Sequence, residues 1–379
     1  MMGSAAAFDM ARSARVELVT LADAERSRAN SAAARVNKLT NGRKVRAVLL
    51  DATSEKAAAR LMRSHDAALS AVPYFHNLGL ARAAIAARCH FADLGGNNTV
   101  VRKEMELSKR AEKRGVALAP DCGLSPGMAS ILAGELMRRI GGEAAALKIY
   151  VGGLPAEPKP PFNYQLVFSV HGLINEYAEP ARILRNGTVT TVEPLTECET
   201  FHIRGFPALE AFHTSGGTST LPETFAGKVG ECFEKTLRCR GHLALIRGLY
   251  DLGLFSQKKT LVGGREVVPR DLIAHLFEER FAGSAPDVTI MRVEAHEKQS
   301  AGMRKPRVLS FTLVDRYDAE TGMTSMMRTT AWPAAVIVQM LASGQIAKRG
   351  AIRQELDVPA ETFLNAMEAR GVNIKYEER

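Results

Sequence analysis

The sequence contains few cysteines, and none of them are closely spaced. Five occur in 379 residues, with no Cys-x-x-Cys motif: Cys89, Cys122, Cys198, Cys232 and Cys239. A zinc ribbon requires closely spaced pairs, and a disulfide scaffold requires a high density of cysteines in a short chain, so neither is the basis of this fold. Scattered cysteines are typical of reduced thiols, and we therefore expect a cytoplasmic protein.

Long hydrophobic runs are also missing, and we expect no secretory leader in the given sequence. No stretch of 18 or more apolar residues occurs, so we expect no membrane-spanning helix. The first 17 residues, MMGSAAAFDMARSARVE, lack the charged start and apolar core of a signal peptide. The formal net charge is +9, but basic residues alternate with acidic ones and form no stripe that could follow phosphates. We expect no nucleic-acid partner, and expect the charge to attract a small anionic cofactor or substrate.

Short apolar strands alternate with helices over the first third of the chain. Strands are expected at residues 15–22, 45–51, 67–72, 89–94 and 116–119, and helices at 2–13, 54–63, 78–88 and 100–114. Such alternation predicts a doubly wound parallel α/β sheet. We therefore predict a Rossmann-type dinucleotide-binding domain over residues 1–125.

The N-terminus matches the second half of a dinucleotide fingerprint. Gly3 would be the last glycine of a G-x-G-x-x-G turn, and Asp23 the acid about 20 residues later that binds the adenosine ribose. That acid repels a 2′-phosphate, so we predict NAD rather than NADP. The start of the turn would lie upstream of Met1, and we expect a sheet without its first strand that binds NAD poorly and unfolds easily. The alternative is a separate alanine-rich helix in which Gly3 has no such role.

Glycine and polar residues gather where the expected strands end, which is the edge of an open α/β sheet that binds ligands. Asp121 follows the strand at 116–119, and Ser125 with Pro126 is typical of a helix start. A plain turn explains the glycines nearly as well. The remaining candidates for cofactor binding are Asp51, Pro73, Tyr74, Gly95 and Gly96.

The pattern changes after residue 144, where strands predominate. Strands are expected at 148–151, 164–170, 187–192, 288–296 and 308–314, with a proline-rich loop at 152–162 and a turn at 319–322 that leads into an antiparallel strand at 323–330. This pattern predicts a second, mixed α/β domain over residues 126–330. An apolar stripe then predicts a helix that Pro333 opens.

Three polar stretches of the second domain could carry chemistry. Thr214 and Ser215 lie in the loop EAFHTSGGTSTLPET, whose hydroxyls and backbone donors suit a carboxylate or phosphate, and His213 begins it as a base or, more commonly, a structural residue. KTLRCRGH is expected as a strand with Arg238 and Arg240 on one face, suited to binding a carboxylate or simply solvated. GLINEY places Glu176 beside a phenol, and no metal-ligand cluster stands out.

Six segments together resemble the saccharopine dehydrogenase-like family, and within it the L-lysine 6-dehydrogenases. They are DLGGN at 93–97, PDCGLSPGM at 120–128, YVGGLP at 150–155, GLINEY at 172–177, EAFHTSGGTST at 210–220 and TLRCRGH at 236–242. The resemblance implies NAD-dependent oxidation of the ε-amine of lysine to the 6-semialdehyde, which cyclises to piperideine carboxylate. It also implies a cytoplasmic homo-oligomer, in which the second domain oligomerises, and a helical segment at 331–379 that returns to the nucleotide domain.

Two alternatives stay open: a saccharopine or carboxynorspermidine dehydrogenase or reductase, and a nucleotide-binding protein without catalysis. In an amine dehydrogenase the substrate ammonium, with a pKa of about 10.4, must lose a proton before hydride leaves. Four residues could accept that proton, and the sequence does not rank them: Asp121, Tyr164, Glu176 and His213. Arg238 or the loop of Thr214 and Ser215 would bind the substrate carboxylate.

Overall fold

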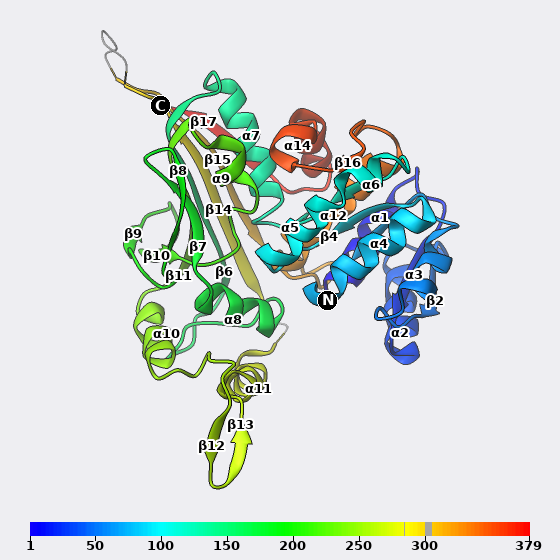
Figure 1. The fold of residues 1–379 in the computed structure, drawn as a ribbon, viewed down its shortest axis with the longest axis horizontal. Coiled ribbons are helices and arrows are strands. Elements are labelled where there is room, and N and C mark those ends of the chain that lie inside the picture. Colours follow the sequence, from blue (N-terminus) through cyan, green and yellow to red (C-terminus); the bar gives the residue numbers. More distant parts are fainter. Residues whose placement is uncertain (284, 300–304) are drawn as a thin grey trace. The chain divides into compact units, whose positions relative to one another are not determined.

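The structure is a computed structural model that describes residues 1–283, 285–299 and 305–379, which divide into two compact units (Figure 1). Unit 1 comprises Met1–Gly134, Ala319–Met323 and Met327–Val372, and unit 2 comprises Glu135–Asp318, Thr324–Met326 and Asn373–Arg379. The first division lies within helix α7 (Met128–Arg139), later than the boundary expected after residue 125. None of the helices in the described ranges is long and apolar enough to cross a membrane.

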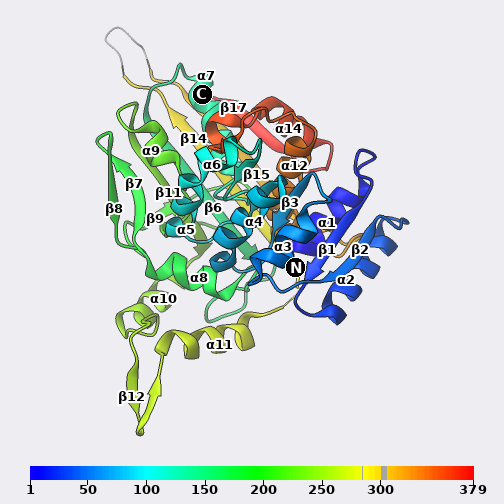
Figure 2. The same cartoon turned by 45° about the vertical axis from the view of Figure 1, so that its right-hand side comes forward.

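Unit 1 alternates strands and helices along the chain, as the sequence predicts. Its elements before α7 are α1 (Met2–Arg12), β1 (Val19–Asp23), α2 (Arg26–Leu39), β2 (Val45–Leu49), α3 (Glu55–Met62), β3 (Ala67–Ser70), the short helix η1 (Tyr74–His76), α4 (Asn77–Ala87), β4 (His90–Asp93), α5 (Asn98–Glu106), α6 (Ser108–Glu112) and β5 (Ala117–Ala119). Local capping contributes, since the Ser54 hydroxyl accepts a hydrogen bond from the Ala57 amide and Asn97 caps α5 in the same way. Buried alanines let α3 and α4 pack closely, as Figure 2 shows.

The strands of unit 1 form two parallel sheets, which confirms the predicted parallel α/β fold. β1 pairs with β2, and the second sheet has the order β16-β5-β4-β3, in which β16 (Gly350–Ala351) comes from the C-terminal part of the chain. Among the described residues β1 does not pair with β3. The parallel strands of unit 1 are therefore divided between a sheet of β1 and β2 and a sheet of β16, β5, β4 and β3.

The C-terminal part of unit 1 is anchored to its first helix. It contains most of α12 (Ser325–Ala342), followed by α13 (Gln354–Asp357) and α14 (Ala360–Glu368). Asp9 of α1 is fully buried, and its carboxylate accepts hydrogen bonds from Arg370 at 2.7 Å and Gln339 at 3.2 Å. The last strand, β17 (Ile374–Glu378), instead belongs to unit 2, so the segment expected at 331–379 is divided between the units.

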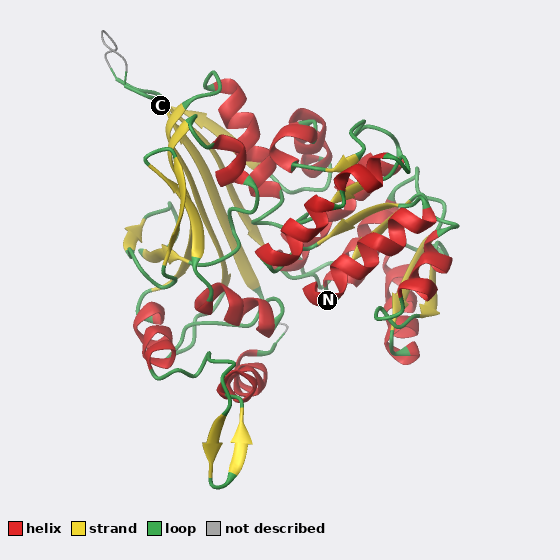
Figure 3. Cartoon of the chain, viewed as in Figure 1, coloured by secondary structure: helices red, strands yellow, loops and turns green. Residues whose placement is uncertain are grey.

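Unit 2 is built on a mixed nine-stranded sheet, drawn in yellow in Figure 3. Its main order is β17-β15-β14-β6-β11-β10-β9, and β7 pairs with both β11 and β8. The strands are β6 (Ala144–Pro155), β7 (Ala181–Arg185), β8 (Thr188–Val192), β9 (Glu199–Phe201), β10 (Leu209–His213), β11 (Val229–Cys239), β14 (Asp287–His296) and β15 (Val308–Arg316). A separate hairpin of β12 (Thr260–Val262) and β13 (Arg265–Val267) projects beyond α11 in Figures 1 and 2.

Three helices of unit 2 pack together around an aromatic core. They are α8 (Val170–Ala178), α10 (His242–Asp251) and α11 (Pro269–Phe281), and a fourth helix, α9 (Leu221–Phe225), is short. The core between them includes Tyr164, Tyr177, Phe212, Phe255 and Phe277. Because two of these side chains carry hydroxyl groups, this core also brings polar atoms into the interior.

Three sequence predictions about unit 2 are wrong. Residues 325–330, expected as part of a strand, instead form the start of α12, because the buried Asp287 carboxylate accepts hydrogen bonds from the backbone amides of Ser325 and Met326. Gly152 continues β6 instead of starting a loop, since it lets β11 approach so closely that a Cβ would lie 2.5 Å from the Leu237 oxygen. Residues 164–170 form only an isolated bridge at Leu166 before α8 begins.

Two predicted helix starts are also displaced. Helix α7 begins at Met128 rather than directly after Ser125, because Gly123 and Gly127 first form an isolated bridge. Pro333 does not open a helix but lies inside α12, which begins eight residues earlier at Ser325. Near Pro333 the apolar stripe marks the helix correctly, although the helix starts earlier than the proline suggests.

Candidate active site

At the carboxyl ends of β3, β4 and β5 the loops of unit 1 converge on two glycines. Gly95 and Gly96 have φ angles of 71° and 114°, which side chains rarely adopt. A Cβ atom on Gly95 would lie 1.8 Å from Asp121 Oδ1, and one on Gly96 would lie 3.3 Å from Tyr74 Cβ. The structure thus brings together four of the predicted residues: Tyr74, Gly95, Gly96 and Asp121.

Asp93, which sequence reasoning missed, fixes this arrangement. Its buried Oδ1 accepts hydrogen bonds from the Gly95 amide at 2.7 Å and the Asp121 amide at 3.3 Å. Gln354 of the C-terminal segment donates to the carbonyl oxygens of Pro120 and Asp121, at 2.7 and 2.8 Å. Bare backbone at the ends of parallel strands fits a nucleotide, as in open α/β sheets generally.

The other predicted cofactor residues lie at the expected strand ends. Asp23 ends β1, and its carboxylate accepts a hydrogen bond from the Glu25 amide at 2.9 Å. Asp51 follows β2 and binds Thr53, whose amide and hydroxyl lower the Asp51 pKa. Pro73 precedes η1, and Gly3 lies in the first turn of α1, where a Cβ would be 3.5 Å from Ala71.

A second buried acid, Glu104 of α5, leads to a prediction about stability. Burial, followed by the neighbouring Asp93 and Asp121, raises the pKa of Glu104 far above its usual range. The unfolded chain releases this proton near pH 4.3 and the folded chain keeps it, so stability falls as pH rises above that value. Glu104→Gln should therefore raise the melting temperature at pH 8, with a difference that shrinks toward pH 4.5.

The control for this prediction is Glu106→Gln, because Glu106 is exposed on the same helix. It should leave the melting temperature nearly unchanged at both pH values. A Glu104→Gln protein that melts lower than the unsubstituted protein throughout this range would show that Glu104 is ionised in the fold.

In unit 2, Arg238 of β11 is the centre of a buried polar cluster. Its Nε donates to the Tyr177 hydroxyl at 3.0 Å, its Nη1 donates to the Leu237 oxygen at 3.0 Å, and its Nη2 lies 3.7 Å from Glu176 Oε2. Its guanidinium carbon lies 5.2 Å from the centroid of the Tyr164 ring. Burial alone would lower the Arg238 pKa, but the nearby Tyr177, Tyr164 and Glu176 raise it, so the side chain stays charged.

Tyr177 and His242 form a directed chain behind Arg238. His242 Nδ1 donates to the Phe162 oxygen at 2.9 Å, because a carbonyl can only accept. Its Nε2 lies 3.0 Å from the Tyr177 hydroxyl, and burial lowers the His242 pKa to about 3, so the neutral ring accepts there. Since Arg238 only donates, the chain has one direction and holds the guanidinium in place.

Glu176 lies beside this cluster and retains access to solvent. Its side chain is 30% exposed, whereas that of Arg238 is 4% exposed. Loss of hydration raises the Glu176 pKa to about 7, and Arg238 partly opposes this shift. A carboxyl group with a near-neutral pKa, within reach of a ligand, is suited to accept a proton at physiological pH.

Tyr164 lies over the same cluster. Its hydroxyl is buried and has no hydrogen-bond partner in the described part of the chain, and its ring lies 5.2 Å from that of His242. Burial raises the Tyr164 pKa well above its usual value, so the phenol stays protonated and cannot serve as a base near neutral pH. Of the predicted bases, the cluster contains Tyr164 and Glu176, and the pKa values favour Glu176.

The Thr214 loop is joined to the cluster by backbone and side-chain contacts. The Ser215 amide donates to the backbone carbonyl oxygen of Glu176 at 3.0 Å. The Thr214 hydroxyl lies 3.2 Å from Glu234 Oε2 and 2.7 Å from the Thr236 hydroxyl. Glu234 and Thr236 belong to β11, as Arg238 does, so the loop and the arginine share one support.

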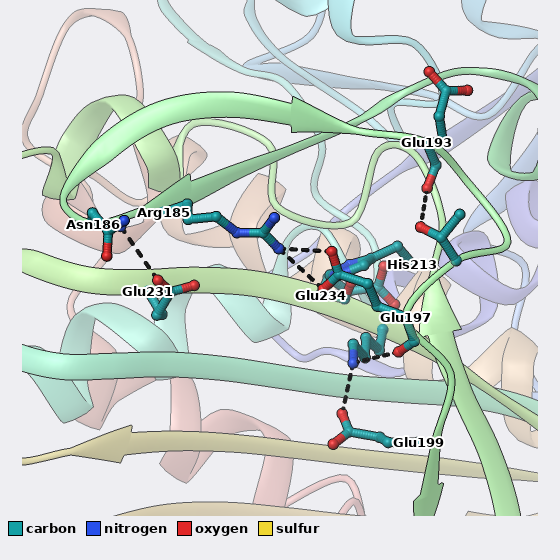
Figure 4. Close-up of polar contacts among 10 residues, drawn as sticks. Arg185, Asn186, Glu193, Glu197, Glu199, His213, Glu231 and Glu234 are labelled. Carbon is teal, nitrogen blue, oxygen red and sulfur yellow. Dashed lines mark hydrogen bonds and ion pairs between the residues drawn. The ribbon is translucent and has the colours of Figure 1, made fainter.

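His213 is part of a different network, shown in Figure 4. Its Nδ1 lies 3.2 Å from the Glu234 backbone oxygen and its Nε2 lies 3.2 Å from Glu197, which also pairs with Arg185 at 2.8 Å. Burial and then Lys235 lower its pKa. None of these contacts involves the Arg238 cluster, which favours the structural interpretation of His213.

Arg240 differs from its prediction, because β11 ends at Cys239 and Arg240 is exposed beyond it. Arg238 therefore has no arginine partner on the same face. Sequence reasoning also assigned no role to three buried residues: Tyr177 and His242 of the cluster, and Glu234 beneath the Thr214 loop. Tyr177 ends the motif GLINEY and His242 ends the motif TLRCRGH. The only sign of their roles in the sequence is that Tyr177 follows Glu176 and that His242 follows the strand of Arg238.

Two family models match nearly the whole chain. The saccharopine dehydrogenase NADP binding domain matches residues 1–120, and the saccharopine dehydrogenase C-terminal domain matches residues 123–372. The boundary between these matches is close to the domain boundary expected from the sequence.

Similar proteins of known activity are distant. The saccharopine dehydrogenase (NADP+, L-glutamate-forming) of Pyricularia oryzae is 24% identical over 220 residues, which cover 56% of this chain and 48% of that protein. The corresponding enzyme of Saccharomyces cerevisiae is 22% identical, with coverages of 61% and 56%. The mitochondrial alpha-aminoadipic semialdehyde synthase of Mus musculus is 25% identical, with coverages of 52% and 22%. The matches thus span about half or less of these relatives.

Solved structures share the fold. Apo saccharopine dehydrogenase (L-Glu forming) from Saccharomyces cerevisiae has a TM-score of 0.79 at 17% identity, covering 100% of this chain and 98% of that one. Homospermidine synthase from Legionella pneumophila, in complex with NAD, has a TM-score of 0.64 at 10% identity, covering 95% and 85%. With both family models matched along its length, the chain belongs to the saccharopine dehydrogenase-like family of nicotinamide-dependent oxidoreductases.

Proposed function

We propose that this protein is an amino-acid dehydrogenase that oxidises the ε-amine of L-lysine to the 6-semialdehyde, which cyclises to piperideine carboxylate. The observation that supports it most is the pairing of Glu176 and Arg238 in one cluster of unit 2. A carboxyl with a pKa of about 7 and a permanently charged guanidinium match the two ends of an amino acid. Unit 1 supplies the cofactor residues.

In this proposal Glu176 removes the proton that keeps the substrate nitrogen cationic. The nitrogen lone pair then assists departure of hydride from the ε-carbon, giving an iminium that water converts to the aldehyde with release of ammonium. A bound nicotinamide dinucleotide supplies the hydride acceptor. Arg238 holds the α-carboxylate, together with Thr214 and Ser215 of the neighbouring loop, and so sets how far the ε-carbon reaches.

The cofactor we propose is NAD. Asp23 ends β1, where an acid binds the ribose hydroxyls of NAD and repels a 2′-phosphate. Arg28 is close in sequence and could attract a 2′-phosphate, but its guanidinium forms an ion pair with Glu25 at 2.8 Å. The residues that would hold the dinucleotide are Gly3 in the first turn of α1 and, after the strands, Asp51, Pro73, Tyr74, Gly95 and Gly96, and Asp121 borders Gly95.

Asp23→Ser should lower the preference for NAD over NADP by about tenfold or more, because the repulsion of the 2′-phosphate is lost. The measurement is the ratio of kcat/KM for the two cofactors. Glu17→Ser, at an exposed acid two residues before β1, is the matched control and should change the ratio little. An unchanged ratio in Asp23→Ser would mean that this carboxylate does not meet the ribose.

Substrate identity is tested by following reduced nicotinamide with L-lysine alone, with saccharopine alone, and with lysine plus 2-oxoglutarate and reduced cofactor. We expect turnover with lysine alone. Turnover only with saccharopine, the activity named for the relatives above, would replace the proposal with a saccharopine dehydrogenase. Absence of turnover on all of them, with intact cofactor binding, would favour a nucleotide-binding protein without catalysis.

We further propose a cytoplasmic homo-oligomer. All five cysteines are free, as suits a reducing compartment. Leu261 and Val262 of the β12–β13 hairpin are 72% and 59% exposed, and adjacent exposed apolar side chains are typical of a surface that a second copy covers. Sedimentation velocity measures the assembly state, and a monomer at micromolar concentration would contradict this proposal.

A further inference from the structure

Glu234 closes a ring of three hydrogen-bonding groups beneath the Thr214 loop. Its Oε2 lies 3.2 Å from the Thr214 hydroxyl, its Oε1 lies 3.2 Å from the Thr236 hydroxyl, and the two hydroxyls lie 2.7 Å apart. All three side chains are buried. Glu234 has no ion-pair partner in the parts of the chain that the structure describes. Figure 4 labels Glu234 and His213, whose ring contacts the backbone oxygen of Glu234 and not its carboxyl group.

Counting protons shows which form of Glu234 fits this ring. Each threonine hydroxyl carries one proton, so an ionised Glu234 leaves two protons for three contacts. One pair of oxygens would then face each other without a hydrogen between them. A neutral carboxyl adds the third proton, and every contact becomes a hydrogen bond in a cycle that runs in either direction.

The ring also fixes the position of the loop. A Cβ atom on Gly217 would lie 2.5 Å from Glu234 Cγ, so the loop rests directly on this side chain. Thr214 belongs to the loop and Thr236 to β11, two residues before Arg238. The Ser215 amide joins the same loop to Glu176. Glu234 therefore supports the loop that carries Thr214 and Ser215, which we assign to binding of the substrate carboxylate.

We propose that Glu234 is held uncharged and acts as a positioning residue, whose proton closes the ring that orders the Thr214–Gly217 loop for substrate binding. Its effect on substrate rests on the function proposed above, whereas its protonation does not. It touches no reacting atom itself.

The surrounding charges agree with this assignment. Burial, followed by the negative charge of Glu176 from α8, raises the pKa of Glu234 to about 8, although the two threonines and Arg238 oppose the shift. His213 contacts only the Glu234 backbone oxygen, and the Lys235 ammonium is bound to the Glu197 oxygen and Glu199. We therefore expect the ring to lose its proton as pH rises through about 8.

Infrared difference spectroscopy tests the protonation directly and needs no substrate. The spectrum of the unsubstituted protein minus that of Glu234→Gln should show the carbonyl stretch of a protonated carboxyl group at pH 6, which fades as pH rises through about 8. Glu231→Gln on the same strand is the control and should give no such band, since Glu231 is only half-buried and accepts a hydrogen bond from the Asn186 amide instead of closing a ring with hydroxyl groups. A carboxylate band from Glu234 at pH 6 would overturn the proposal.

Kinetics test the positioning role. KM for the substrate should rise above pH 8 in the unsubstituted protein, with a smaller change in kcat. Glu234→Gln, whose amide both donates and accepts, should keep the low KM and lose this pH dependence, whereas the shorter Glu234→Asp should raise KM about tenfold at all pH values. If Glu234→Gln raises KM as much as Glu234→Asp does, the ring does not depend on a proton. Should lysine not be the substrate, the infrared result still decides the state of Glu234.

Discussion

Glu176→Gln should lower kcat for amine oxidation by about 10²–10⁴-fold, the range expected when a general base is removed. The unsubstituted enzyme should lose kcat/KM as pH falls through about 7, because the Glu176 carboxyl takes up a proton there and can no longer accept one from the substrate. In Glu176→Gln this acidic decline should be absent. Steady-state rates between pH 5.5 and 9 measure both effects.

Glu179→Gln is the matched control for this result. Glu179 caps the same helix, and burial also raises its pKa, but its electrostatic neighbour is Arg270 rather than Arg238. It should retain near-normal kcat and the acidic decline. If Glu176→Gln keeps the kcat and pH profile of the unsubstituted enzyme, the base lies elsewhere, and Asp121 is the next candidate.

Arg238→Ala should raise KM for L-lysine by about 10–150-fold, because hydrogen bonds to a charged group contribute about 1.5–3 kcal/mol. KM for simple alkylamines, which have no carboxylate, should change far less. The ratio of the two KM values isolates carboxylate binding from any general damage to the site. An equal loss on both substrates would mean that Arg238 supports structure or chemistry instead.

Arg238 also donates a hydrogen bond to Tyr177, so Arg238→Ala could act through structure. A second substitution separates the loss of charge from the loss of this contact. Arg238→Lys keeps the charge but loses the planar fork that donates to Tyr177 and Leu237. It should bind lysine with an affinity between those of the unsubstituted enzyme and Arg238→Ala. A melting temperature within a few degrees of the unsubstituted enzyme shows that the fold is intact.

The fold of unit 1 could be predicted because its information is local. Apolar runs end at turn residues, and helices of regular length separate them, so strand ends such as Asp23 and Asp93 lie close to where periodicity places them. The prediction of a strand at residues 323–330 is wrong because a residue far away in the sequence determines where the helix begins. The Asp287 carboxylate caps α12, and nothing near Ser325 in the sequence reveals it.

The candidate site was only partly predictable for the same reason. Glu176, Tyr164 and Arg238 stand out by residue type, and the structure brings them together. Glu234 and His242 act through partners on other strands and loops, such as Thr214 and the Phe162 oxygen, so spacing along one segment gives no sign of them. His213 could be either a base or a structural residue from the sequence, and its contact with Glu197 favours the structural role, the more common of the two.

The most direct test of the central claim follows the hydrogen that the substrate loses. L-lysine carrying deuterium at the ε-carbon is incubated with NAD and the enzyme, and the reduced nicotinamide is analysed by mass spectrometry. The account predicts that deuterium appears on the nicotinamide, that piperideine carboxylate accumulates, and that both are strongly reduced in Glu176→Gln. Transfer of deuterium only from lysine labelled at the α-carbon, or no transfer unless saccharopine is supplied, would contradict it.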